Sequence, residues 1–231
     1  MRPELIVFDL DGTLIDSRRD LADATNAVIE ELGGVRLSVD EVTSYIGEGA
    51  GVLVKRALKA AGLDRVPAHA LDRFLAHYEQ RLTVHTRPYQ GIPEALDVLR
   101  EQGCTLAVLT NKPERPTREI LARLALESKF DDVVGGDTRA GRKPDPAGLL
   151  QIIARAGTSP SSTVLVGDSP VDFRTALNAG THICLARYGF GYRFADDAFQ
   201  GNELFVDAPE ELVSLINGSQ EEGRRESRRD G

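Results

Sequence analysis

Residues 5–13 read Leu-Ile-Val-Phe-Asp-Leu-Asp-Gly-Thr, an apolar run of four residues followed at once by two carboxylates two positions apart. The run is typical of a buried strand, and Asp9 and Asp11 stand where that strand gives way to a tight turn. Strand geometry points both side chains the same way. Their repulsion raises the pKa of one carboxyl group, or a metal cation neutralises the pair. Taken alone, the stretch fits a solvated Asp-x-Asp-Gly turn equally well.

Short apolar runs recur along the chain and alternate with helical patterns. Helical periodicity covers 92–100 and 115–124, and it recurs around Leu149, Leu150 and Ile153. The predicted strands are 5–8, 106–109, 133–134, 163–166, 183–185 and 204–206. Strands that alternate with helices predict an α/β fold, a doubly wound, Rossmann-like parallel sheet covered by helices on both faces.

The long stretch between the first two predicted strands lacks a strand pattern and exceeds a simple crossover. Apolar residues recur there at helical spacing, and Ser38 with Glu41 forms a capping box. The two apolar stripes are Leu21, Ala24, Val28 and Leu32, and Leu71, Leu75, Tyr78 and Leu82. We therefore expect a helical cap over residues 15–85, inserted into a Rossmann-like core of residues 1–14 and 86–217. Residues 218–231 are polar and predict a disordered tail.

Composition restricts the function classes. The formal net charge of −8 argues against nucleic acid or an anionic membrane as a partner. No apolar run approaches the roughly 20 residues that span a bilayer, and the N-terminal residues lack a signal-peptide pattern, so we expect a cytoplasmic protein. Cys104 and Cys184 do not have the spacing of a metal site. The pattern does not indicate an oligomeric state.

Polar side chains follow three further predicted elements. Thr110 and Asn111 end the strand 106–109, Lys143 lies in a proline-flanked loop before a helix, and residues 167–172 (Gly-Asp-Ser-Pro-Val-Asp) end the strand 163–166. Each has an ordinary explanation as a helix cap or a loop charge. Because the carboxyl ends of parallel strands meet at one crevice, the four sets together predict a site.

These residue types suit phosphoryl transfer. A carboxylate nucleophile forms an acyl phosphate and divides a slow hydrolysis into two easier steps. Asp9, Asp168 and a loop carbonyl are oxygen ligands of the kind that Mg²⁺ prefers. Lys143, the Thr110 hydroxyl and backbone amides are suited to phosphoryl oxygens. Asp11 is then placed to protonate the leaving oxygen and later to deprotonate water.

Residues 8–14, Thr110, Lys143-Pro144 and residues 167–172 resemble, in order, the four motifs of the haloacid dehalogenase superfamily. The resemblance implies that Asp9 is the nucleophile and that Asp11 is the acid/base, with its backbone carbonyl on the metal. It also implies that Thr110, Asn111 and Lys143 bind phosphate, that Asp168 holds Mg²⁺, and that Asp172 supports the site. The family fold is a doubly wound sheet, and an insert after the first motif is its cap.

Asp11 separates phosphatases from the dehalogenase branch, since halide departure needs no proton. Residues 45–58 and 86–92 resemble the cap segments of phosphoglycolate phosphatases. Gly47, Glu48 and Gly49 are therefore expected to contact a small substrate that carries a carboxylate beside its phosphate, most simply 2-phosphoglycolate. Arg18 and Arg19, which stand where the family often has small residues, could tune an anionic entrance or be surface charge.

The alternatives are a related capped phosphatase or a phosphosugar mutase acting on another small phosphorylated metabolite. A phosphoryl-receiver module would place its acid pair and its phosphorylated aspartate on different strands and needs no large cap. A catalytically inactive binding protein is a fourth possibility, although every position that the chemistry requires is occupied.

Overall fold

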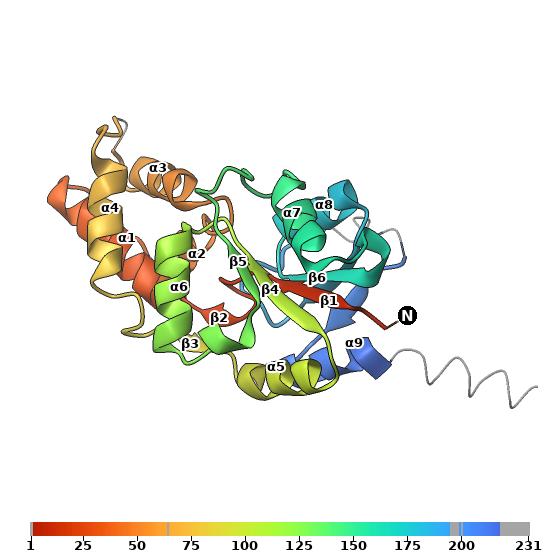
Figure 1. Ribbon diagram of the computed structural model, residues 1–231. Helices are drawn as coiled ribbons and strands as arrows, with labels where there is room; N and C mark the ends of the chain where they lie inside the picture. The colour runs from red at the N-terminus through yellow and green to blue at the C-terminus, as the bar shows by residue number, and fades with distance from the viewer. Residues whose placement is uncertain (1, 64, 195–198, 200, 218–231) are drawn as a thin grey trace, which may run out of the picture.

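The computed structural model describes residues 2–63, 65–194, 199 and 201–217 (Figure 1). Six strands form a parallel sheet in the order β5-β4-β1-β6-β7-β8. They are β1 (Leu5–Phe8), β4 (Thr105–Leu109), β5 (Asp132–Val134), β6 (Thr163–Gly167), β7 (His182–Ala186) and β8 (Leu204–Val206). The predicted doubly wound sheet is confirmed, with each strand within one residue of its expected bounds.

The strand order reverses next to β1. The chain runs outward from β1 through β4 to β5, returns to pair β6 with the other side of β1, and continues outward to β8. Such a switch point leaves a crevice at the carboxyl ends of the strands, where open α/β sheets bind ligands. The loops that follow Phe8, Leu109 and Gly167 therefore lie side by side.

Strand alternation divides the core between the two faces of the sheet. Ile6 and Phe8 pack into one apolar cluster with the helices α5 (Ile92–Glu101) and α6 (Glu114–Arg123). Leu5 and Val7 pack into the other with α7 (Ala147–Ala156) and α8 (Pro170–Ala179), which cover the opposite face (Figure 1). Burial on both faces explains why β1 is an unbroken apolar run.

Short helical segments complete the core. They are η1 (Glu127–Lys129), η2 (Pro160–Ser162), η3 (Pro209–Val213) and α9 (Ser214–Asn217). One detail of the predicted helix around Leu149 was wrong. Leu149 and Ile153 are buried as expected, but Leu150 is exposed and Ile152 takes its place against the sheet.

Four helices between β1 and β4 pack together on one side of the sheet (Figure 1). They are α1 (Arg18–Glu31), α2 (Val39–Thr43), α3 (Ala50–Ala60) and α4 (Ala70–Glu79). The Ser38–Glu41 capping box at the start of α2 is present. The predicted α4 stripe is shifted, because Leu71 is exposed while Phe74 is buried and stacks on Tyr78. The exact bounds of a cap unit at 15–85 stay a prediction.

The two short strands at the base of these helices were not predicted from the sequence. Strand β2 (Ile15–Asp16) pairs antiparallel with β3 (Arg87–Pro88), where the chain leaves the sheet and returns to it. A strand of two residues is too short to show the alternation of apolar and polar residues that predicts a strand. The predicted boundaries at 15 and 86 place these paired strands in different units, so the division runs through this ribbon.

Asp20 of α1 holds the returning chain beside the ribbon. Its wholly buried carboxylate accepts hydrogen bonds from the backbone N–H groups of His85 and Thr86 and from the Thr86 hydroxyl, at 2.7–3.1 Å. A buried charge of this kind is stable only because several donors compensate its desolvation.

The predicted disordered tail, 218–231, lies outside the described residues. Among the described helices, none is both long enough and apolar enough to cross a membrane.

We predict that Asp20→Ala lowers the free energy of unfolding by about 3 kcal/mol, since it leaves buried N–H donors without an acceptor. Urea denaturation followed by circular dichroism measures the change. Asp23→Ala on the same helix removes a carboxylate that pairs with Arg19 and Arg36 near the surface, and it should cost less than about 1 kcal/mol. Equal losses of unfolding free energy in the two variants would contradict the stabilising role of the Asp20 hydrogen bonds.

Candidate active site

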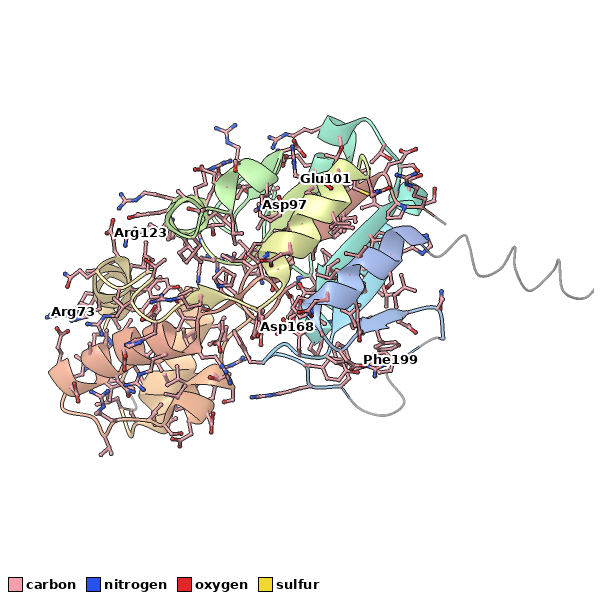
Figure 2. The ribbon with its side chains drawn as sticks, turned by 90° about the horizontal axis from the view of Figure 1, so that it is seen from below. Arg73, Asp97, Glu101, Arg123, Asp168 and Phe199 are labelled. Carbon is pink, nitrogen blue, oxygen red and sulfur yellow. The ribbon has the colours of Figure 1, made fainter. Side chains whose placement is uncertain are left out.

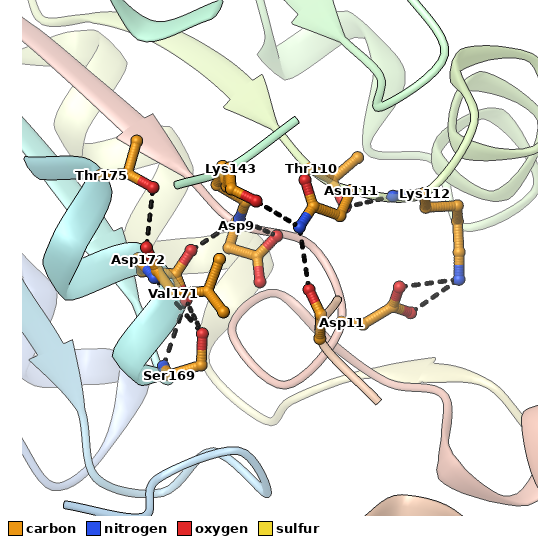
Figure 3. A network of polar contacts seen from close by, with 11 residues as sticks. Asp9, Asp11, Thr110, Asn111, Lys112, Lys143, Ser169, Val171, Asp172 and Thr175 are labelled. Atoms are coloured by element: carbon orange, nitrogen blue, oxygen red, sulfur yellow. Dashed lines mark hydrogen bonds and ion pairs between the residues drawn. The ribbon is translucent and has the colours of Figure 1, made fainter. Parts of the chain in front are cut away.

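Three buried carboxylates and one buried lysine meet at the ends of β1 and β6, and Figure 3 shows Asp9, Asp172 and Lys143 of this cluster. Asp9 follows β1 directly, and its N–H donates to the carbonyl of Val166 in β6 at 2.8 Å. Asp168 follows β6, and Asp172 lies in the first turn of α8. The Lys143 ammonium lies 2.7 Å from Asp9 and 2.6 Å from Asp172. In the view from below, Asp168 lies between the cap helices and the C-terminal part of the core (Figure 2).

Asp172 is held by the local sequence of the α8 start. One carboxylate oxygen accepts from the Ser169 N–H at 3.1 Å and from its hydroxyl at 2.5 Å, completing a capping box, while the other faces Lys143. The side chain therefore caps a helix and fixes the lysine at once. This contact with Lys143 suits the supporting role that was expected of Asp172.

Burial dominates the electrostatics of the cluster. It raises the pKa of Asp9 to about 6, although Lys143 opposes the shift. Burial, reinforced by Asp172 and Asp9, raises the pKa of Asp168 well above its ordinary value. For Lys143, burial alone would lower the pKa, but Asp172 and Asp9 outweigh it and hold the ammonium charged. One cation thus faces three carboxylates.

The cluster fits a divalent cation. Carboxylate oxygens of Asp9, Asp168 and Asp172 lie within 4.8 Å of one another, and oxygen donors of this kind suit Mg²⁺. A divalent charge would balance the two negative charges that Lys143 leaves uncompensated. The predicted metal residues Asp9 and Asp168 are therefore together, whereas the Asp11 side chain lies with other partners.

Glycines make room around the Asp168 carboxylate. A Cβ on Gly12, whose φ is +94°, would lie 2.0 Å from Asp168 Oδ2, and one on Gly189 would lie 2.3 Å from Asp168 Cβ. The N–H of Gly191 donates to Asp168 Oδ2 at 2.7 Å. The loop 189–191 after β7 therefore shapes the acid cluster, and no strand or motif pattern in the sequence had marked it.

Asp11 has its own buried partner. The Lys112 ammonium lies 2.8 Å from both Asp11 oxygens, and the Ser17 hydroxyl donates to Asp11 Oδ1 at 2.5 Å. Lys112 also donates to the Tyr78 hydroxyl of α4 at 2.8 Å. Asp9 and Asp11 line the same pocket, but they pair with different lysines.

The loop after β4 joins the pocket to the cap helices. Thr110 is buried beside Asp9 in the pocket lining, and its hydroxyl accepts from the backbone N–H of Lys112 at 3.2 Å. Asn111 donates its amide to the carbonyls of Gly47 and Lys143, at 3.0 and 3.1 Å. In this arrangement the Asn111 side chain ties the cap to the core rather than offering a donor to phosphate.

Two of the three cap residues that were predicted to contact the substrate line the pocket, and the third does not. Gly47 and Gly49 line the pocket, and Gly49, with φ of +92°, is the N-cap of α3. Glu48 is exposed, lies outside the pocket lining and pairs with Arg56 at 2.7 Å. The expectation that Glu48 contacts the substrate is not supported by its position.

Arg18 and Arg19 lie at the base of the cap and outside the pocket lining. Arg18 pairs with Asp16 at 2.6 Å, and its guanidinium lies 5.8 Å from the centre of the Phe190 ring. Arg19 pairs with Asp23 at 3.1 Å. Both arginines therefore stabilise the base of the cap through pairs of their own.

The chain is similar to characterised families over most of its length. Residues 6–186 match the family model described as haloacid dehalogenase-like hydrolase. The chain belongs to the haloacid dehalogenase-like hydrolases. The predicted family resemblance is therefore confirmed.

Relatives within the haloacid dehalogenase-like hydrolases point to one branch. The phosphoglycolate phosphatase of Aquifex aeolicus is 39% identical over 213 residues, which cover 92% of this chain and 96% of the relative. The phosphoglycolate phosphatase of Rhodospirillum rubrum is 42% identical over 195 residues, 81% of each chain. A crystal structure of a predicted phosphoglycolate phosphatase from Haemophilus somnus is 30% identical, with a TM-score of 0.86 over 93% of this chain and 98% of that one.

Sequence reasoning missed Lys112 and misread Tyr78. Lys112 directly follows Thr110-Asn111, so its position in the motif was the available signal. Tyr78 fell on an apolar helical stripe and was interpreted as packing, which is half correct because its ring stacks on Phe74.

We predict that Mg²⁺ binds the metal-free protein more weakly as the pH falls below about 6. The pKa of Asp9 is raised to about 6, so below that pH the cation must displace a proton, and affinity should fall up to about tenfold per pH unit for each proton displaced. Calorimetric titration in two buffers of different ionisation enthalpy counts the protons. Asp9→Asn lacks the titrating carboxyl group and should release fewer protons when Mg²⁺ binds.

Equal affinity at pH 5 and pH 7.5 would contradict this expectation. The same raised pKa makes the folded, metal-free protein bind more protons than the unfolded chain between about pH 4 and pH 6. The contribution of Asp9 to the stability of the metal-free protein should therefore decrease as the pH rises through that window.

Proposed function

We propose that the protein is a Mg²⁺-dependent phosphomonoester hydrolase that works through an aspartyl-phosphate on Asp9. The observation that carries the proposal is that two carboxylates, Asp9 and Asp11, line one pocket and that each is held by a different buried lysine. Lys143 holds Asp9 in the acid cluster, while Lys112 and Ser17 hold Asp11 a short distance away. A nucleophile and a proton-transfer group need such separate environments.

In the first step a carboxylate oxygen of Asp9 attacks phosphorus, the bond to the ester oxygen breaks, and Asp11 gives that oxygen a proton. In the second step Asp11 takes a proton from water as the water attacks phosphorus, which restores Asp9 and releases inorganic phosphate. Lys143 and the Thr110 hydroxyl would bind phosphoryl oxygens in both steps. Mg²⁺ held by Asp9 and Asp168, with the Asp11 backbone carbonyl, would neutralise the phosphoryl charge.

We propose 2-phosphoglycolate as the substrate, which would give glycolate and phosphate. The named relatives support this choice. The pocket also supports a small substrate, because its cap-side lining consists of glycines, apolar residues and the Tyr78 hydroxyl. The apolar residues on that side are Leu21, Ile46, Ala50, Leu53, Phe74 and Leu75.

The same wall argues against a phosphosugar mutase. A sugar ring would bring several hydroxyl groups against side chains that cannot hydrogen-bond them, at a cost of about 1–3 kcal/mol for each group left unsatisfied. A related capped phosphatase that acts on another small phosphorylated acid remains the second candidate, since the acid cluster and Lys143 would serve either substrate.

We predict that 2-phosphoglycolate has the highest kcat/KM in a panel of phosphorylated metabolites, and that turnover requires Mg²⁺. Asp9→Asn should abolish turnover, because the amide cannot form the acyl phosphate. Phosphate release measured with and without chelator checks both points. Activity that survives in Asp9→Asn would refute the mechanism, whereas sugar phosphates that outrun 2-phosphoglycolate would refute only the substrate.

For Asp11→Asn we predict slow turnover with the phosphoenzyme trapped on Asp9, since the variant lacks the group that deprotonates water. Acid quenching followed by intact-mass measurement detects the covalent phosphate. Ser17→Ala is the graded control, because it removes one hydrogen bond to Asp11 and keeps the carboxylate. An unchanged rate in Asp11→Asn would remove its acid/base role.

A further inference from the structure

A second buried lysine faces the pocket beyond the acid cluster. The Lys112 side chain is 5% exposed, and its ammonium lies between Asp11 of the core and Tyr78 of α4 (Figure 3). It lies 4.8 Å from the centre of the Tyr78 ring, whose hydroxyl accepts one of its hydrogen bonds. Burial alone would lower the pKa of Lys112, but Asp11 and Tyr78 outweigh it and keep the ammonium charged.

Lys112 is the one cation among the described residues that line this pocket. Lys143 is nearby, but it is enclosed by Asp9 and Asp172. Arg56 pairs with Glu48 on the surface of the cap. A second anionic group of a substrate, apart from its phosphate, therefore has one positive side chain to meet within the pocket.

The geometry of the proposed reaction brings the carboxylate of the substrate close to Lys112. The ester oxygen of the substrate must lie at Asp11, which gives it a proton. In 2-phosphoglycolate one methylene group separates that oxygen from the carboxylate, so the carboxylate cannot lie far from Asp11. Lys112, 2.8 Å from Asp11, is within reach of it.

A substrate carboxylate would share the ammonium with Asp11. The ammonium carries three N–H donors, and two of its three described acceptors are oxygens of the one Asp11 carboxylate, so one N–H can turn to the substrate while Asp11 keeps another. Without Lys112, a carboxylate beside Asp11 would meet like charge, apolar side chains and the uncharged polar groups of Thr110, Asn111 and Tyr78, with no cation among the described residues of the pocket lining to balance it. With Lys112, the substrate carboxylate gains a charge-assisted hydrogen bond in a buried site.

We infer that Lys112 is the specificity-determining residue of this site and binds the carboxylate of small phosphomonoesters whose acidic group lies one carbon from the ester oxygen. Tyr78 holds the ammonium in place from the cap side. The inference rests on the proposed roles of Asp9 and Asp11 and adds the residue that recognises the carboxylate of the substrate.

The test compares 2-phosphoglycolate with ethyl phosphate, which carries a methyl group in place of the carboxylate. In Lys112→Met we expect the ratio of the two kcat/KM values to fall about 10- to 100-fold, mostly through KM for 2-phosphoglycolate. Lys55→Met, the same substitution on an exposed residue of α3 outside the pocket lining, should leave the ratio unchanged. Tyr78→Phe keeps the ammonium but removes one of the contacts that position it, so the ratio should fall by less than in Lys112→Met.

Two further variants guard against misfolding. Lys112→Gln provides a second neutral side chain, and Lys112→Arg restores the charge and should recover part of the ratio. Calorimetric binding of 2-phosphoglycolate to Asp9→Asn, with and without Lys112→Met, measures recognition without turnover, and the affinity should fall by a similar factor.

A role confined to holding Asp11 would lower both kcat/KM values equally, and that result overturns the inference. It is also overturned if the wild-type protein does not distinguish the two esters. The proposed mechanism is judged separately by Asp9→Asn, and the proposed substrate by the metabolite panel, so the failure of each can be recognised.

Discussion

The shared contact of Lys143 with Asp9 and Asp172 is the interaction on which the site depends. It joins the loop before α7 to the ends of β1 and β6, and all three side chains are nearly enclosed. Charges this deep cost several kcal/mol each to desolvate unless they are paired. The pairing is incomplete, because Asp168 adds a third carboxylate to one ammonium. The fold thus builds a site with a surplus of negative charge, which a divalent cation would balance.

The loop after β4 serves both the core and the cap. Thr110 faces the pocket, Asn111 donates to Gly47 of the cap, and Lys112 donates to Tyr78 of α4. Three consecutive residues therefore connect the site with the two cap segments that cover it. Any movement of the cap must break or remake the contacts of Asn111 and Lys112. The position of the cap and the surroundings of Asp11 are consequently coupled through a single short loop.

The sheet was predictable because its strands are buried on both faces and read as unbroken apolar runs, as in 5–8 and 163–166. The order of the motifs then placed Asp9, Lys143 and Asp168 at one edge by the geometry of parallel sheets alone. The remainder depended on tertiary contacts. The strands β2 and β3 have two residues each, too few to show an alternating pattern. Leu150 and Ile152 are both apolar, and only the packing of α7 against the sheet decides that Ile152 is buried and Leu150 exposed.

Charged side chains were harder to predict than apolar ones, because their role is set by a partner that is distant in sequence. Glu48 was expected in the pocket, yet Arg56 on the next helix holds it at the surface. Lys112 shows the opposite case, since Asp11 and Tyr78 bring it into the interior from positions 101 and 34 residues away.

The two buried lysines differ in what holds them. Both partners of Lys143 belong to the core, Asp9 directly after β1 and Asp172 in the first turn of α8, so its contacts do not depend on the cap. Lys112 has one partner on each side, and the Tyr78 ring and hydroxyl shield it from water. A chemical step needs a constant field around phosphorus, whereas recognition gains from a cation whose surroundings are completed when the cap closes on its substrate. The division of partners between core and cap therefore supports the proposed roles, in which Lys143 binds the phosphate and Lys112 the remainder of the substrate.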